Sequence, residues 1–184
     1  MFEISFPAAE WTFTAVWLLV RIVIWLKQKS IDWKREAVLA LMYINLAVII
    51  RFVFFPRDLA GGRVQLLVFE AASAFPPRVN LVPLIRLFRY GSVRDIVWNV
   101  AGNTAMFVPS GIVLPVVYRR LDSFRKTVAA GALLSLSIEI LQLPFLSRAS
   151  DIDDLILNTL GTAVGYGIYA AFRCLKRQKR EHSV

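Results

Sequence analysis

The chain has 184 residues, of which 57% are hydrophobic, and its formal net charge is +9. Soluble domains are roughly 45–50% apolar even when glycine is counted, so this composition excludes an ordinary soluble domain and an intrinsically disordered chain. The sequence has one cysteine, Cys174, which is too few for a disulfide framework. Its one histidine, His182, lies two residues before the last, which argues against hydrolysis by a Ser–His or Cys–His pair. The composition predicts one all-α integral membrane domain over residues 1–184.

Transmembrane helices need about 20 mostly apolar residues. In chain order, such runs predict five helices at about residues 10–27, 36–55, 95–119, 125–144 and 153–174. The first run is too long for a signal peptide and lacks a small-residue cleavage pattern, so we expect it to remain as a span. Arg21 and Arg51 interrupt the first two runs, and Glu139 interrupts the fourth.

The connection between the second and third predicted helices, residues 56–94, is too long for a bare loop. Its apolar stretches, residues 64–75 and 81–88, predict interfacial or re-entrant helical segments. The connection also carries six arginines, which are Arg57, Arg63, Arg78, Arg86, Arg89 and Arg94. We expect them at the level of the lipid headgroups, where they either bind a specific anion or only attract anionic lipid.

The basic residues outside the predicted helices set the expected orientation. Thirteen lie on the side of the first connection, the third connection and the basic tail 173–184, and seven lie on the other side. Basic residues are enriched in cytoplasmic loops. This distribution predicts an external N-terminus and a cytoplasmic C-terminus, although the six arginines of the 56–94 connection oppose it.

Polar side chains gather near the outer ends of three predicted helices. Polar groups within hydrocarbon usually face a helix-bundle interior or a watery cavity. Spacing places each of the following sets on one helical face: Asn99 with Asn103, Glu139 with Gln142, and Asp151 with Asp154 and Asn158. Asp153 points about 100° away from Asp154, and Arg148 lies in the connection before them. We predict one outward-facing cavity lined by these groups, with Arg148 paired to a carboxylate and residues 80–94 as its roof.

Each part of this set also has a structural interpretation. Asn99 and Asn103 can serve as hydrogen-bonding groups between helices, and a carboxylate at the start of a helix can act as a cap. Capping explains one of the three aspartates more readily than all three. Glu139 favours a functional or site-organising role, because a carboxylate within apolar sequence must be protonated, paired or in contact with water. Gly161 and Gly165 form a GxxxG step, which predicts close helix packing.

Five short motifs follow one another over the latter half of the chain. They are Asn80-Leu81-Val82-Pro83; Asn99 with Gly102-Asn103; Phe107-Val108-Pro109-Ser110-Gly111 with Leu114-Pro115; Glu139 with Gln142; and Arg148 ahead of Asp151-Ile152-Asp153-Asp154, Asn158, Gly161 and Gly165. In this order they resemble the VanZ-like family of bacterial membrane proteins. The resemblance covers about residues 78–172, and it departs from the family pattern at Leu84, where phenylalanine is usual. It implies an inner-membrane protein of the bacterial envelope that is linked to susceptibility to the glycopeptide teicoplanin, without implying a mechanism.

The leading functional hypothesis is a protein that binds an anionic envelope lipid or peptidoglycan-precursor headgroup at the outer leaflet. Whether it also modifies this headgroup stays open. The candidate catalytic carboxylates are Glu139, Asp151 and Asp154. The candidate ligand-binding residues are Arg78, Asn80, Arg86, Arg89, Asn99, Asn103, Gln142, Arg148, Asp153 and Asn158. The alternatives are a non-catalytic factor that limits access of glycopeptides to their target, and a lipid transporter, although no inverted repeat is evident.

The sequence also sets expectations about cofactors and partners. Zinc sites draw mainly on cysteine and histidine, so we expect no zinc and no resident cofactor. A Mg²⁺ or Ca²⁺ ion at the aspartates of residues 151–154 stays open, because such ions prefer oxygen ligands. The expected partners are membrane lipids and not nucleic acid, and the sequence leaves homo-oligomerisation open.

Overall fold

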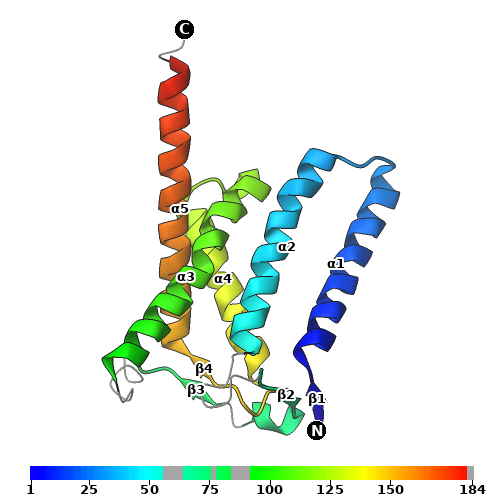
Figure 1. The fold of residues 1–184 in the computed structure, drawn as a ribbon, viewed down its shortest axis with the longest axis vertical. Coiled ribbons are helices and arrows are strands. Elements are labelled where there is room, and N and C mark those ends of the chain that lie inside the picture. The colour runs from blue at the N-terminus through cyan, green and yellow to red at the C-terminus, as the bar shows by residue number, and fades with distance from the viewer. Residues whose placement is uncertain (56–63, 76–77, 84–91, 182–184) are drawn as a thin grey trace. The chain divides into compact units, whose positions relative to one another are not determined.

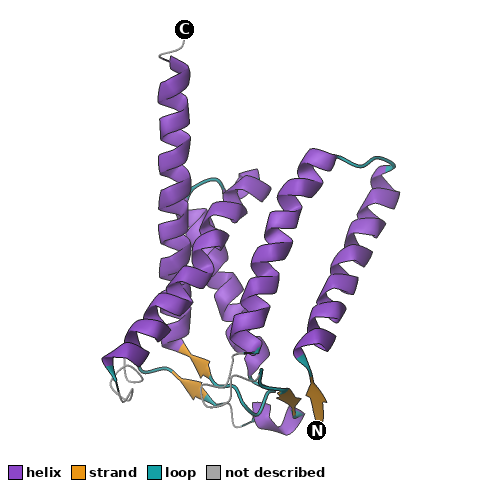
Figure 2. Cartoon of the chain, in the orientation of Figure 1, coloured by secondary structure: helices purple, strands orange, loops and turns teal. Residues whose placement is uncertain are grey.

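The computed structural model describes residues 1–55, 64–75, 78–83 and 92–181 (Figure 1). Its helices are α1 (Phe6–Gln28), α2 (Trp33–Phe54), α3 (Val93–Val117), α4 (Phe124–Gln142) and α5 (Ile152–Glu181). Its short elements are strands β1 (Phe2–Ile4), β2 (Leu67–Phe69), β3 (Val79–Asn80) and β4 (Ser150–Asp151), and 3₁₀ helices η1 (Ala71–Ala74) and η3 (Arg119–Leu121). Helices account for most of the ribbon in Figure 2, which confirms the predicted all-α membrane class.

Four of the described helices are long and apolar enough to cross a membrane, namely α1, α2, α3 and α5. The fifth, α4, is 19 residues long and carries Arg125 and Lys126 at its start and Glu139 near its end. A helix of this length still extends about 28 Å, close to the thickness of the hydrocarbon core. The directions of the neighbouring helices α3 and α5 therefore bear on whether α4 crosses the membrane.

The described chain divides into a first unit, residues 1–80 with 139–150, and a second unit, residues 81–138 with 151–184. In the second unit α3 and α5 run in the same direction. Asn103 contacts Asp154 near their starts, and further along both helices the backbone of Gly111 lies against Gly165. Since α4 connects the end of α3 to the start of α5, and these two helices are parallel, we expect α4 to run antiparallel to both.

Side-chain contacts confirm that α4 runs antiparallel to α5. Ser135 of α4 bonds Asn158 of α5, and one turn earlier Gly131 lies against Thr162. Near the start of α4, the ring of Phe124 meets Tyr166 edge-on at 5.9 Å between centroids. The second unit is therefore a three-helix, up-down-up arrangement. The five described α-helices match the five predicted helices, and four of them are long and apolar enough to cross a membrane.

Small residues set the close approach of α3 and α5. A Cβ atom built at Gly161 would overlap the carbonyl oxygen of Thr104, and one at Gly165 would overlap the carbonyl oxygen of Val108. A third glycine, Gly111, lies on the α3 side of the same contact. The predicted role of the GxxxG step in helix packing is confirmed, since any side chain here would force the backbones apart.

The first unit begins with an antiparallel hairpin of α1 and α2. Thr14 and Tyr43 share a hydrogen bond of 2.7 Å between their hydroxyl oxygens. The ring of Phe13 stacks on Tyr43 with 5.4 Å between centroids. Arg21 forms an ion pair with Glu36, and these side chains are only 10% and 15% exposed. The arginine that interrupts the first apolar run is thus neutralised by the second helix.

The rest of the first unit is held together by main-chain pairing. Strands β1 and β2 pair antiparallel, with Phe2 opposite Phe69. The N–H groups of Leu146 and Glu70 bond the carbonyls of Val68 and Pro144, at 3.0 and 2.9 Å. Part of residues 64–75, which we expected to be helical, is therefore strand β2 followed by the single turn η1, because partner strands satisfy its backbone groups. Most of the other predicted piece, residues 81–88, lies outside the described residues.

Substitution of the packing glycines should separate α3 from α5. We expect Gly165→Ala and Gly161→Ala each to lower the free energy of unfolding by about 1–3 kcal/mol, the usual cost of overpacking. The matched control is Gly167→Ala, because a Cβ atom there meets nothing within 4 Å. Thermal unfolding of the detergent-solubilised chain measures all three variants. Equal midpoints for Gly165→Ala and Gly167→Ala would contradict the packing described above.

Candidate functional site

The amides predicted on α3 and α5 form hydrogen bonds between helices of the second unit. Asn103 donates its side-chain N–H to Asp154, with 2.7 Å between Nδ2 and Oδ1. Asn158 donates to the hydroxyl of Ser135 at 2.9 Å, and both residues are fully or almost fully buried. Asn99 lies one turn before Asn103 and is partly exposed. The bond between Asn103 and Asp154 directly joins two of the polar faces predicted on different helices.

The three aspartates at the start of α5 have different environments. Asp151 is 2% exposed, and its Oδ1 accepts the backbone N–H of Asp153 at 3.0 Å, the contact of a helix N-cap. Asp153 is 5% exposed, and Asp154 receives Asn103. Within the described chain, no group of three or more His, Cys, Asp or Glu side chains is arranged to hold a metal ion. The capping interpretation therefore explains Asp151 but not its two neighbours.

In the first unit, three side chains close the C-terminal end of α2. The carbonyl oxygens of Val53 and Phe54 accept bonds from Gln142 and Arg148, at 3.5 and 2.8 Å. The next carbonyl, that of Phe55, accepts a bond from Arg51. The last carbonyls of a helix have no partner within the helix, and cations are favourable at this end of the helix dipole. We call Arg51, Gln142 and Arg148 the α2 clamp.

Residues 145–148 also bring a second guanidinium group into the first unit. Arg78, just before β3, donates to the carbonyl oxygens of Leu146 and Phe145. Strand β3 follows directly, and Ser150 donates its N–H to the Arg78 carbonyl at 3.0 Å. Arg78 is exposed and Arg148 is partly buried. The guanidinium group of Arg78 is therefore bonded to this segment, and that of Arg148, which belongs to the segment, is bonded to the end of α2, in both cases through neutral carbonyls.

Arg148 keeps bonding capacity beyond the α2 clamp. Burial lowers the pKa of its guanidinium group, which still stays protonated at neutral pH because arginine titrates far above that range. Its Nε atom has no hydrogen-bond partner among the described residues, and the same is true of Oε1 of Gln142. A partly buried, permanently charged donor of this kind can bind an anion through charge-assisted hydrogen bonds.

The predicted site residues fall into both units. Arg78, Asn80, Glu139, Gln142 and Arg148 belong to the first, and Asn99, Asn103, Asp151, Asp153, Asp154 and Asn158 belong to the second. Arg86 and Arg89 lie outside the described residues. Glu139 is only 4% exposed. The single shared cavity and the pairing of Arg148 with a carboxylate stay predictions.

The sequence did not reveal two of the polar partners found here. Ser135 lies among small and apolar residues of α4 with no spacing that marks it, and Arg51 resembled an isolated charge in the second apolar run. A signal existed for Arg51, because it stands one turn before the end of a helix that Pro56 is expected to stop.

Comparison with known proteins establishes the family. The VanZ/LLP1 family model matches residues 40–173. The chain belongs to the VanZ/LLP1 family. The match begins inside α2, so the family pattern includes the C-terminal part of this helix as well as the motifs between residues 78 and 172. The VanZ-like resemblance is therefore confirmed.

One curated relative of this VanZ/LLP1 chain is Protein VanZ from Enterococcus faecium. The two are 32% identical over 102 residues, which cover 55% of this chain and 58% of the relative. The chain thus aligns with little more than half the length of that protein. No solved structure matches the chain.

Removal of the guanidinium group at position 148 should loosen the end of α2. We expect Arg148→Gln to lower the free energy of unfolding by about 1.5–3 kcal/mol, because hydrogen bonds to charged groups contribute about this much. Amide hydrogen exchange should rise in the last turns of α2. The matched control is Arg120→Gln on the exposed η3, where a change below about 0.5 kcal/mol is expected. Unchanged exchange in α2 of Arg148→Gln would contradict the clamp.

Proposed function

We propose that this VanZ/LLP1 chain binds the anionic headgroup of an envelope lipid or peptidoglycan precursor at the outer leaflet of the bacterial cytoplasmic membrane, and thereby acts in resistance to glycopeptides such as teicoplanin. One observation carries the proposal. Arg78 donates to the carbonyls of Phe145 and Leu146, close in sequence to Arg148, which donates to the carbonyl of Phe54, so the hydrogen bonds described for both arginines go to neutral carbonyls. Guanidinium groups in such positions suit the planar, two-point recognition of phosphate or carboxylate.

The buried carboxylates supply a second part of the proposal. Glu139 is 4% exposed and lies in the same unit as the two arginines. A carboxylate held away from water can orient a bound cationic or hydroxyl group, or carry a proton. We assign these roles to Glu139. Asp154, which is partly buried and lies in the second unit, stays a separate candidate, and Asp151 is given a structural role because of its capping contact.

Binding without chemistry is the second candidate. Asn103, Asn158, Asp151 and Gln142 all make contacts that stabilise helices or helix ends. With these four groups occupied in packing, fewer side chains are left for a catalytic step. This supports a factor that shields its target from the glycopeptide without altering the target.

The proposed orientation follows from charge and topology together. The excess of basic residues in the first and third connections and in the tail favours a cytoplasmic C-terminus. The up-down-up arrangement of α3, α4 and α5, added to the α1–α2 hairpin, gives an odd number of crossings. An odd number puts the N-terminus on the opposite, outer side.

A resistance assay tests the proposed function. Expression of the chain in a teicoplanin-susceptible bacterium should raise the inhibitory concentration of teicoplanin. Glu139→Gln and Asp154→Asn should remove this effect, because each replaces a carboxylate with a neutral amide of the same shape. The matched control is Glu10→Gln, which makes the same change at an exposed carboxylate of α1 and should retain full resistance.

Abundance, folding and orientation are measured in the same cells. All variants should reach the membrane at equal levels and keep their thermal midpoints. A membrane-impermeant thiol reagent should label Glu3→Cys from outside and leave Gln178→Cys unlabelled, with Cys174→Ser as background. No gain of resistance from the unmodified chain would contradict the resistance assignment. Full resistance in both Glu139→Gln and Asp154→Asn would mean that these two carboxylates have a purely structural role.

A further inference from the structure

A pocket lies at the connection between α1 and α2, the part of the chain for which the proposed function gives no role. Its volume is about 560 Å³, within the range of about 300–1,000 Å³ typical of ligand sites. The apolar part of its lining includes Ile22, Trp25, Leu26 and Trp33, and the polar part consists of Lys29 and Ser30. The pocket therefore combines a mainly apolar lining with one cationic side chain and one hydroxyl group.

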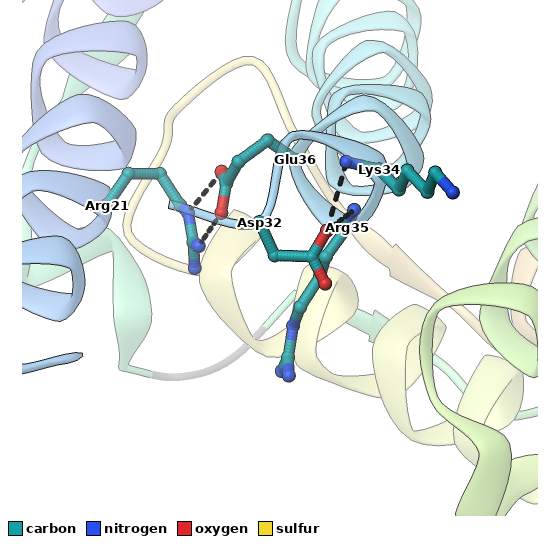
Figure 3. Close-up of polar contacts among 5 residues, drawn as sticks. All are labelled: Arg21, Asp32, Lys34, Arg35 and Glu36. Atoms are coloured by element: carbon teal, nitrogen blue, oxygen red, sulfur yellow. Dashed lines mark hydrogen bonds and ion pairs between the residues drawn. The ribbon is translucent and has the colours of Figure 1, made fainter. Parts of the chain in front are cut away.

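Both carboxylates of this connection are already occupied, as Figure 3 shows. Asp32 caps α2 by accepting the backbone N–H groups of Lys34 and Arg35, at 3.1 and 3.2 Å. Glu36 accepts the Nε–H of Arg21 at 2.9 Å. No dashed contact reaches the charged ends of the Lys34 and Arg35 side chains in the figure. Arg21 therefore neutralises Glu36, and the carboxylate of Asp32 is directed to the N-terminus of α2.

The connection carries more positive than negative charge, and this excess can attract an external anion. Four of them lie within nine positions, and they are Lys27, Lys29, Lys34 and Arg35. The structure describes no salt bridge for any of the four within the described part of the chain. Each basic residue close to an anionic membrane surface adds about 1 kcal/mol of attraction, so the connection has a marked preference for negative headgroups.

Lys29 lines the pocket together with Ile22 and Leu26. It ends α1 in the left-handed conformation, with φ 52°, and its N–H donates to the carbonyl of Trp25 at 2.9 Å. Glycine is the usual residue at such a position, and an L side chain there costs roughly 1–2 kcal/mol. The chain nevertheless has lysine here, which adds a positive charge to a mainly apolar lining.

We propose that this pocket binds one anionic phospholipid. The phosphate lies at the Lys29 ammonium, and an acyl chain lies along Ile22 and Leu26. Indole rings prefer the depth at which tails meet headgroups, which suits Trp25 and Trp33 in the same lining. The pocket is at the opposite end of α2 from the clamp, about 33 Å away for 22 residues. The inference therefore does not rest on the proposed function, nor on which way the chain is inserted.

Lipid-dependent stabilisation of the full-length chain tests this site. Purified protein in detergent is titrated with phosphatidylglycerol, with phosphatidylcholine of the same acyl chains, and with inorganic phosphate, while thermal unfolding and native mass spectra are recorded. We expect a bound phosphatidylglycerol and a raised midpoint. Phosphatidylcholine and free phosphate should do neither at the same concentration.

Three variants locate the lipid in the pocket. Lys29→Gln should weaken phosphatidylglycerol binding about fivefold, the equivalent of about 1 kcal/mol for one basic residue at a membrane surface. Leu26→Ser keeps every charge and should also weaken binding, because it removes part of the apolar wall. Lys176→Gln removes one exposed charge outside the pocket and should bind as the unmodified chain does.

Three outcomes would overturn the inference. Equal binding of phosphatidylglycerol and phosphatidylcholine would remove the role of Lys29. Equal losses in Lys29→Gln and Lys176→Gln, with none in Leu26→Ser, would mean diffuse attraction to surface charge. A dimer that disappears in Leu26→Ser without any lipid selectivity would make a second copy of the chain the occupant.

Discussion

The carbonyl groups at the end of α2 are the constraint on which the first unit depends. The last carbonyl groups of a helix have no partner within the helix, and in or near hydrocarbon there is little water to bond them. Here Gln142 and Arg148, which follow α2 by about 90 positions, supply the missing donors together with Arg51. The clamp fixes the segment after α4 against α2. Main-chain bonds then attach β2 to that same segment, and the side chain of Arg78 bonds it as well, so several distant parts of the chain assemble around one helix end.

The polar side chains of the candidate site in this VanZ/LLP1 protein fall into two groups. Asn103 with Asp154, and Asn158 with Ser135, join helices whose close approach is set by glycine. Polar bonds between membrane helices contribute modestly, about 0.6–2 kcal/mol each, so packing and hydrogen bonding are both needed. Arg78 and Arg148 form the other group. The hydrogen bonds described for them go to carbonyls, which do not neutralise a positive charge, and this is why we assign anion recognition to them and not to the amides.

The helices could be predicted from the sequence because runs of apolar residues are a local signal. Contacts between distant segments could not. Arg21 looked like an isolated charge in an apolar run, since nothing local reveals that the hairpin register brings Glu36 beside it. Strand β2 was missed because its partners are β1 and residues 144–146, and pairing overrode the apolar pattern. The spacing of polar residues placed Asn103 and Asp154 on helix faces that are in contact in the structure. The bond from Arg148 to Phe54 joins residues far apart in the sequence, and helical periodicity carries no information about such a pair.

Identification of the lipid retained by the purified chain tests the central claim most directly. The chain is extracted from bacterial membranes in mild detergent, and the lipids that stay bound are identified by native mass spectrometry, beside an Arg78→Gln, Arg148→Lys double variant. We predict that the unmodified chain retains a lipid or lipid-linked precursor with a phosphate or carboxylate headgroup, and that the double variant, which loses both planar guanidinium groups, loses that species. Retention of the same lipids by both proteins, or of zwitterionic lipids alone, would contradict headgroup recognition by Arg78 and Arg148.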